Sequence, residues 1–245
     1  MRLGLRIEHL QSFINEHQYG KYANHPSLKA ADYKLAVKTS NGRGVYTFCM
    51  CPGGKVINSS SEAGGIVVNG MSNQARDEAN ANSAVLVTVG PEDFASSHPL
   101  AGITYQRELE QKAFELGGKD YSVPVMRVED YLNDTLDLKM EEVSCSVQPN
   151  VRYAKLSQIF SNEVNLALKE GLQLMNHKFT GFTEKAMLSG VESRSSAPVR
   201  LYRDENFQSN IKGIMPIGEG AGYAGGIMSS AIDGLKCSEF ILKGE

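Results

Sequence analysis

The clearest chemical signature in the sequence is a glycine-rich segment near its end, NIKGIMPIGEGAGYAGGIMSS. Gly220, Gly222 and Gly225 have the spacing GxGxxG, and glycine lets a backbone turn tightly and approach a ligand closely. The apolar run at residues 214–217 predicts a strand before the glycines, and the apolar spacing after them predicts a helix. Free N–H groups at a helix start attract anions. Residues 218–226 therefore predict a strand-to-helix loop that holds an anionic cofactor; the alternative is a tight packing turn.

A complete dinucleotide fingerprint continues into a second parallel strand that ends in an acidic residue about 20 residues further on. Here only Lys243, Gly244 and Glu245 follow the predicted helix. We therefore expect the loop to join the last strand and last helix of an α/β sheet whose earlier strands come from elsewhere. The residues assigned to cofactor binding are Gly218, Glu219, Gly220, Ala221, Gly222, Tyr223, Ala224, Gly225, Gly226 and Ile227.

A second candidate site lies in the segment ESRSSAPVR, which combines two arginines with two hydroxyl side chains. Guanidinium groups bind carboxylates and phosphates through paired hydrogen bonds. The segment predicts a clamp for an anionic group of a small-molecule substrate, and surface ion pairs with Glu192 or Asp204 are the alternative. The residues of this clamp are Arg194, Ser195, Ser196 and Arg200.

A third candidate is the CxC pair Cys49 and Cys51, followed by Pro52 and Gly53. A thiolate near a redox group can exchange electrons or form an adduct. A CxC disulfide ring is strained, so a turn that lets the backbone approach a ligand is the favoured interpretation for Cys51, Pro52 and Gly53. Arg76, in NGMSNQARDEANAN, belongs either to a polar loop over the cleft of the predicted substrate clamp or to a solvated loop.

Composition limits the possible partners. The 245 residues carry a net charge of -3, with 22% charged residues, so the chain has no basic excess for nucleic acid. It has no apolar stretch of membrane-spanning length and no apolar core of a signal peptide in MRLGLRIEHL. Four unevenly spaced cysteines and five histidines without an HxxxH spacing indicate neither a disulfide scaffold nor a metal centre. We expect a cytoplasmic protein.

The elements that position these candidates follow from periodicity and turn signals. Residues 6–17 have helical apolar spacing, and residues 33–88 contain short β-type runs separated by turn residues, with Asn41-Gly42 predicting a type I′ hairpin. Residues 119–149 predict a loop-rich connection with one short helix at 129–133. The remaining predicted helices are residues 99–116, 162–175 and 224–242, and the remaining predicted strands are residues 186–192, 199–202 and 213–217.

The glycine-rich segment resembles the C-terminal FAD motif of bacterial FAD-dependent or NAD-utilising dehydrogenases, in the glutathione-reductase-like class of two-domain flavoproteins. Four other segments resemble the same family in the same order, so the resemblance covers nearly the whole chain. They are GVYTFCMCPGGKVINSSSE, VVNGMSNQARDEANANSAVLVTV, HPLAGITYQRELEQKAFELGG and GVESRSSAPVRLYRD.

The resemblance implies FAD as the cofactor, with NAD(P)H as a candidate electron donor. It places Glu219 near the ribityl or pyrophosphate region, the start of the last helix near flavin N1 and the C2 carbonyl, and Tyr223 beside the ring. The family carries an N-terminal Rossmann unit before the region seen here. We therefore expect a fragment or truncated paralogue that lacks that unit.

The expected fold combines α+β and α/β features: an antiparallel β-sheet substrate domain with helices, plus the closing strand and helix of an FAD-binding Rossmann-like domain. Residues 1–30 form a helical segment, residues 31–185 the substrate domain with a helical insertion, and residues 186–245 the C-terminal part of the FAD domain. The expected function is flavin-dependent hydride transfer with a small substrate. The alternative is a non-enzymatic ligand- or partner-binding module, whereas the absence of GxxxxGK[ST] disfavours a nucleotide hydrolase.

Overall fold

The computed structural model describes residues 1–137 and 145–244. Residues 138–144, part of the predicted loop-rich connection, and residue 245, the end of the predicted FAD-domain portion, lie outside the described residues. The chain divides into two compact units. Unit 1 consists of Met1–Arg2, Gly90–Gln106 and Arg194–Glu245, and unit 2 consists of Leu3–Val89 and Arg107–Ser193.

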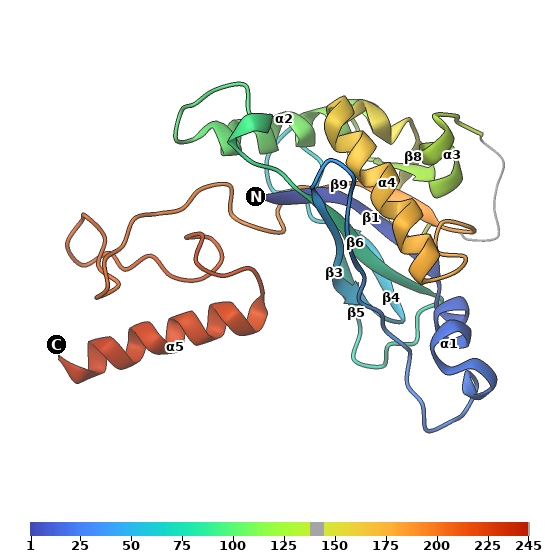
Figure 1. Cartoon of the computed structure of the whole chain (residues 1–245), viewed down its shortest axis with the longest axis horizontal. Helices are drawn as coiled ribbons and strands as arrows, with labels where there is room; N and C mark the ends of the chain where they lie inside the picture. The colour runs from blue at the N-terminus through green and yellow to red at the C-terminus, as the bar shows by residue number, and fades with distance from the viewer. Residues whose placement is uncertain (138–144, 245) are drawn as a thin grey trace. The chain divides into compact units, whose positions relative to one another are not determined.

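Unit 2 is built on a seven-stranded sheet with the order β2-β3-β6-β1-β9-β7-β8, accompanied by a two-stranded β4-β5 sheet (Figure 1). The pairs β2-β3, β3-β6, β1-β9 and β7-β9 are antiparallel, and β7-β8 is parallel. The sheet is therefore mostly antiparallel. The strands are β1 (Arg2–Leu10), β2 (Ala36–Lys38), β3 (Gly44–Cys51), β4 (Gly54–Asn58), β5 (Val68–Ser72), β6 (Asn80–Thr88), β7 (Val123–Arg127), β8 (Val151–Tyr153) and β9 (Met187–Glu192).

Helix α4 packs against β2, β3 and β6 and covers one face of this sheet (Figure 1). Its start is fixed by Ser161, whose hydroxyl accepts a hydrogen bond from the Val164 N–H. Its close approach depends on Gly171, where a Cβ would lie 2.6 Å from a methyl of Val45. The helices are α1 (Gln11–Tyr19), α2 (Ala101–Leu116), α3 (Val128–Asn133), α4 (Asn162–Lys178) and α5 (Ile227–Lys243), with 3-10 turns η1 (Gly20–Tyr22), η2 (Pro91–Asp93) and η3 (Leu156–Gln158).

Several sequence predictions are confirmed. The five β-type runs between residues 33 and 88 become β2 to β6, and the helices predicted at 99–116, 129–133 and 162–175 become α2, α3 and α4. The predicted hairpin pairs β2 with β3. Its turn type was wrong, because only Gly42 has a positive φ, of 83°. Thr39 instead accepts from the Gly42 N–H and donates its own N–H to Arg43, so the loop uses one left-handed glycine.

The helix predicted over residues 6–17 is wrong in its first half, where β1 runs to Leu10 and α1 begins only at Gln11. β1 is buried on both faces, so it lacks the alternation of a half-exposed strand. Its polar residues Arg6, Glu8 and His9 are fully buried as well. They have buried partners, including Glu192 for Arg6, which explains how an apparently amphipathic segment becomes a central strand.

Two predicted strands are also wrong, and two strands besides β1 were missed. Residues 199–202 and 213–217 form no strand, because the sheets are built from unit 2 and no neighbouring strand pairs with these segments in the described part of unit 1. Inside the predicted loop-rich connection lies β7, with β8 shortly after it. β7 is a short buried run between β8 and β9, and Pro124 obscured it because proline is rare in strand interiors.

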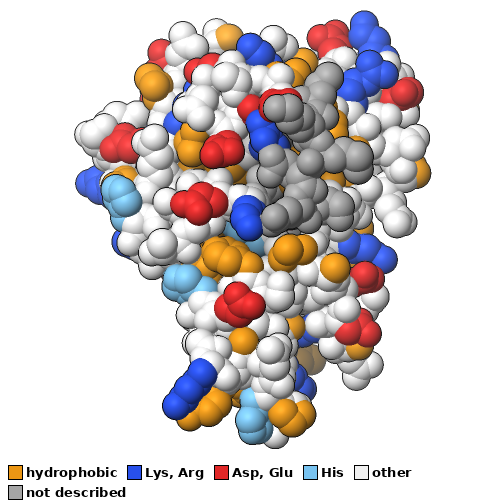
Figure 2. Space-filling view, turned by 90° about the vertical axis from the view of Figure 1, so that its right-hand side faces the viewer, with side chains coloured by type: hydrophobic (Ala, Val, Ile, Leu, Met, Phe, Trp, Pro, Cys, Tyr) orange, Lys and Arg blue, Asp and Glu red, His pale blue; other side chains and the backbone are white. Residues whose placement is uncertain are grey.

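The surface shown in Figure 2 has interspersed basic, acidic and hydrophobic side chains rather than a segregation of the two charge signs. Among the described residues, no helix is both long enough and apolar enough to span a membrane.

Candidate functional site

The predicted cofactor loop is a closed turn within unit 1. Gly218 and Gly222 have positive φ values of 73° and 83°, which glycine adopts without the steric cost of a side chain. The Gly222 N–H donates to the Glu219 carbonyl at 2.8 Å, and the Tyr223 N–H donates to the Gly218 carbonyl at 3.0 Å. These bonds hold residues 218–223 in one compact arrangement directly before α5.

The loop lies against the end of the predicted substrate segment. A Cβ on Gly222 would lie 2.6 Å from the Val199 carbonyl oxygen, so only glycine permits this approach. The Leu201 N–H donates to the Ala221 carbonyl at 3.1 Å, and the Tyr223 hydroxyl donates to the Leu201 carbonyl at 2.9 Å. Residues 199–201 and the glycine loop, both selected from the sequence, are therefore brought together.

Asp233 of α5 anchors the start of the loop. Its carboxylate accepts two 2.8 Å hydrogen bonds from the Arg203 guanidinium and a third, also 2.8 Å, from the Gly218 N–H. These donors, with that of Arg203 as the main contribution, lower the pKa of Asp233. The loop is thereby tied to the second turn of the helix that follows it.

Two guanidinium groups lie over the ring of Tyr223. The Arg203 guanidinium carbon lies 3.6 Å from the centre of its ring, and that of Arg200 lies 4.4 Å away. Guanidinium groups at these distances are attracted to the ring face. Arg200, a predicted substrate residue, is thus a neighbour of the predicted cofactor residue Tyr223.

The start of α5 is open to a ligand. Gly226 precedes the first helical residue, and no side chain in the described part of the chain caps this end. A Cβ on Gly220 would meet no atom within 4 Å, and one on Gly225 would meet only the Arg2 side chain at 3.3 Å. Ala224 and Ile227 flank this end of the helix in the sequence, and Ile227 is 84% exposed. The uncapped N–H groups suit an anion.

The face that α5 buries is not the one its sequence pattern predicts. Within the helix, Asp233 and Cys237 are the buried residues, while Ile227, Leu235 and Ile241 are exposed. In the loop before α5, Ile211 and Ile214 are exposed as well. An apolar stripe of this extent is typical of a surface that contacts another segment or protein.

Glu219 is half-buried in the loop. Burial raises the pKa of its carboxyl group, because an ionised carboxylate is less well solvated there. Among the described residues, no hydrogen-bond donor contacts its side chain. Its carboxyl group therefore remains available to a ligand hydroxyl, the role that the resemblance implies.

The hydroxyls of the predicted substrate clamp contact the start of the chain. Ser196 Oγ accepts from the Arg2 N–H, and Ser195 Oγ donates to the Arg2 carbonyl, both at 2.9 Å. Arg194 is exposed. The two hydroxyls therefore have a structural role in unit 1, and substrate binding by the clamp stays a prediction.

Cys51, Pro52 and Gly53 belong to unit 2. The β3-β6 register shifts between Phe48 and Cys51, and Cys49 has a positive φ of 43°. Burial raises the pKa of the Cys51 thiol although the Arg6 guanidinium lies 3.5 Å from its sulfur. A raised pKa favours the thiol over the reactive thiolate, so the setting supports a structural turn more than a redox pair.

Sequence reasoning missed Arg203 and Asp233, which position the loop. One signal was available, because Asp233 is the first charged residue after the uncharged residues 220–232. Its partner, 30 residues away, has no such signal. Among the described residues, no group of three His, Cys, Asp or Glu side chains is arranged to hold a metal ion.

Comparison with known proteins agrees with an origin among flavoproteins. Residues 1–195 match a family described as "FAD-dependent protein, C-terminal domain-like". The chain is also 49% identical over 244 residues to an uncharacterized protein of Clostridium beijerinckii (strain ATCC 51743 / NCIMB 8052). That alignment covers 98% of this chain and 46% of the relative, so the chain spans just under half of the relative's length. The match over residues 1–195 shows that the chain belongs to the FAD-dependent protein, C-terminal domain-like family.

Proposed function

We propose that this chain is part of a flavin-dependent oxidoreductase and that unit 1 contributes the glycine loop and α5 to its FAD site. Family membership supports a flavoprotein-related role. The loop geometry supports the location, because Gly218 and Gly222 shape a turn directly before an uncapped helix start. Such a helix start favours the negative charge carried by a pyrophosphate or a reduced flavin.

The observation that carries the proposal is the exposed apolar face of α5 beside this loop, including Ile227, Leu235 and Ile241. Burying those side chains against another segment would be favourable by about 25 cal/mol for each Å² removed from water. We assign this face to a dinucleotide-binding segment of the glutathione-reductase-like type. Such a segment would also give residues 213–217 a strand to pair with.

The chain's own residues have defined tasks in this proposal. The α5 N–H groups and the backbone of the glycine loop bind the anionic part of FAD, and Glu219 accepts a hydrogen bond from a ribityl hydroxyl. The bound cofactor would supply hydride transfer. Arg194 and Arg200 are the proposed contacts to an anionic group of a small-molecule substrate. NAD(P)H is the proposed electron donor. A reducing cytoplasm is the proposed location of the protein, because its four cysteines form no disulfide in the described part of the chain.

Gly220 provides a sharp test because a side chain there enters open space and strains no protein contact. The full chain is co-expressed with the part of the Clostridium beijerinckii relative that it does not match, and FAD retention is measured after gel filtration. Gly220→Val should reduce FAD retention without lowering thermal stability. Gly44→Val is the matched control, because its Cβ would make only an ordinary contact, 3.6 Å from the Thr88 hydroxyl.

Two outcomes would contradict the proposal. One is that wild-type chain and complementary segment together retain no FAD. The other is that Gly220→Val and Gly44→Val retain it equally well. If the two segments associated through α5 but stayed colourless, the chain would instead be a non-enzymatic partner-binding module.

A further inference from the structure

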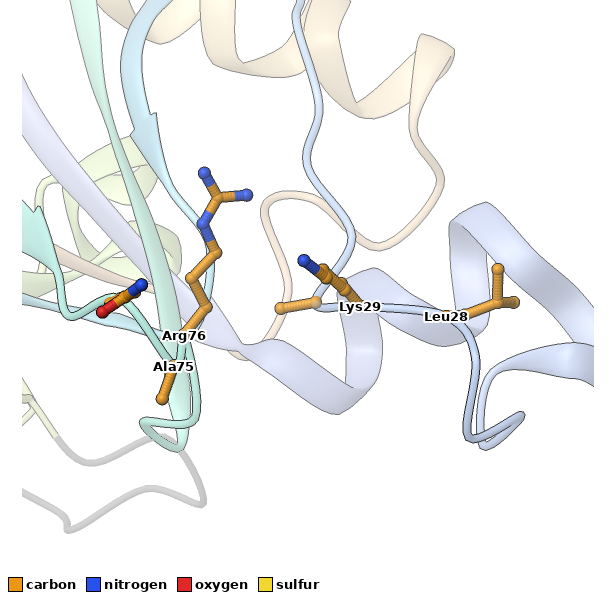
Figure 3. Close-up of a pocket in the computed structure, with 6 residues that line it drawn as sticks. Leu28, Lys29, Ala75 and Arg76 are labelled. Carbon is orange, nitrogen blue, oxygen red and sulfur yellow. The ribbon is translucent and has the colours of Figure 1, made fainter.

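Unit 2 contains a pocket that the flavin proposal does not use. Its volume is about 630 Å³, and its lining residues come from two segments, residues 28–30 and residues 74–76 (Figure 3). Volumes in this range hold small ligands. We propose that this pocket binds a small dianion carrying carboxylate or phosphate groups, held between Lys29 and Arg76.

The first wall is fixed to helix α1. The Leu28 N–H donates to the His25 carbonyl at 2.9 Å, and the Tyr19 hydroxyl donates to the Lys29 carbonyl at 3.2 Å. The Ala31 N–H donates to Asn15 Oδ1 at 2.9 Å. Lys29 therefore extends from a segment with a defined backbone path, although its own side chain is exposed.

The second wall is a tight turn whose position depends on Gly53. The Arg76 N–H donates to the Asn73 carbonyl at 3.1 Å, and Arg76 has a positive φ of 54°. A Cβ on Gly53 would lie 1.9 Å from the Arg76 carbonyl oxygen. Gly53 thus permits the close approach of the turn that carries Arg76. The sequence predicted direct ligand contact for this glycine, whereas its role here is to position the Arg76 turn.

Gln11 connects segments that lie next to the two walls. Its side-chain NH₂ group donates to the Ala31 carbonyl at 3.0 Å, next to the first wall. Its side-chain oxygen accepts from the Gly53 N–H at 2.6 Å, and its backbone N–H donates to the Ala79 carbonyl at 2.8 Å. Gln11 is buried, with only 7% of its surface exposed. One buried side chain therefore ties Ala31, next to the first wall, to Gly53, against which the Arg76 turn packs. Such a constraint is the preorganisation that ligand binding favours.

The two cations have no anionic partner in the described part of the chain. Neither the Lys29 amine nor the Arg76 guanidinium forms an ion pair there; Glu78, the nearby acid, pairs with Lys55 at 3.6 Å. Asp77 follows Arg76 but does not line the pocket. Figure 3 shows Lys29 and Arg76 on the two opposing segments. A dianion would neutralise both charges, and Arg76 can bind a carboxylate or phosphate through two hydrogen bonds.

The remaining lining favours a compact ligand. Leu28, Ala30 and Ala75 provide apolar surface, and Gln74 provides an amide. A short carbon chain fits against the apolar side chains while its charged ends contact the cations. All of these residues belong to unit 2, so this proposal does not depend on the flavin loop.

Isothermal titration calorimetry on the full chain tests the proposal, with inorganic phosphate and succinate as separate probes in a low-salt buffer of a bulky zwitterion. At least one probe should bind saturably with one site per chain. Lys29→Gln and Arg76→Gln should each weaken its binding by about tenfold, the loss typical of one charged hydrogen bond. Lys112→Gln, an exposed lysine on α2, removes the same charge away from the pocket and should leave binding unchanged.

The probe that binds with the higher affinity shows whether the pocket prefers a phosphate or a dicarboxylate. The absence of saturable binding by both probes would overturn the proposal, as would an equal loss of binding in Lys112→Gln. Gly220→Val should leave anion binding intact, so failure here and failure of the flavin proposal are separable.

Discussion

Asp233 accepts two hydrogen bonds from the Arg203 guanidinium, each 2.8 Å long, and a third from the Gly218 N–H. The pair joins α5 to the loop that precedes it. Arg203 also donates to the Pro216 carbonyl at 2.9 Å. One carboxylate and one guanidinium therefore fix the path of the chain on both sides of residue 217.

Asp233→Asn should destabilise unit 1, because an amide cannot accept both Arg203 hydrogen bonds and serve Gly218 as well. The free energy of unfolding should fall by about 1–2 kcal/mol. Urea denaturation followed by circular dichroism measures this change. Glu239→Gln, at an exposed position of the same helix, should stay within about 0.5 kcal/mol of wild type. Equal stability of the two variants would show that the Arg203–Asp233 pair contributes nothing.

The same pair predicts a pH dependence. The pKa of Asp233 is lower in the folded chain than its ordinary value of 3.8. Its stabilising contribution is therefore complete above the unfolded pKa and disappears as pH falls through the lower, folded pKa. The stability difference between wild type and Asp233→Asn, measured in urea from pH 7 down to pH 2, should shrink only at the acidic end. A constant difference would contradict the assignment.

Arg6 and Glu192 predict strong coupling in the core of unit 2. Their 2.7 Å ion pair is buried, and Arg6 also donates to Asn82 Oδ1 at 2.7 Å. Gly70 makes room for it, since a Cβ there would lie 2.1 Å from Arg6 Nη2. Arg6→Met leaves a buried carboxylate unpaired and should cost about 3–5 kcal/mol.

A double-mutant cycle with Glu192→Gln measures that coupling. The double variant should be more stable than the sum of the two single losses predicts, because it no longer buries an uncompensated charge. Additive losses in chemical denaturation would show that the two residues act independently.

His9 predicts a second acidic transition. Burial lowers its pKa from 6.5 to about 4, and its Nε2 donates to the Phe182 carbonyl at 2.8 Å. The unfolded chain therefore binds more protons than the folded chain between these two values, so stability falls as pH drops from about 6.5 to about 4. Chemical denaturation across this range should show the slope. His9→Gln should flatten it, and the exposed His25→Gln should not; identical slopes in all three would refute the assignment.

Local sequence patterns predicted most of the strands and helices that pack against other elements of unit 2. The runs that became β3 and β6 have clear β-type composition, and α4 combines an apolar face with the cap Ser161. β1 was not recognisable, because its charged Arg6 and Glu8 are matched by partners distant in sequence. The periodicity of apolar residues reflects the local sequence alone, whereas the burial of such charges depends on tertiary contacts.

The candidate site was predictable to a similar degree. The glycine spacing located the loop, and Gly222 has the close contact that such a glycine implies. The predicted strand before the loop did not form, because pairing requires a neighbour that the described part of unit 1 does not provide. The apolar residues of α5 were expected in a core, but Leu235 is 64% exposed. Both differences have the same physical cause, because the described part of the chain provides no packing surface for these segments.

Met228 offers the most direct measurement of the central claim, that the start of α5 binds an anionic flavin cofactor. Met228 is the second residue of α5 and is 72% exposed. A carboxylate there stabilises an unliganded helix by about 0.3–1 kcal/mol but repels a bound anion. In complex with the complementary segment, Met228→Glu should bind FAD several-fold more weakly than Met228→Gln in a flavin fluorescence titration, while the free chain melts at an equal or higher temperature. Equal FAD affinity of the two variants, or the absence of FAD binding by the wild-type complex, would contradict the account.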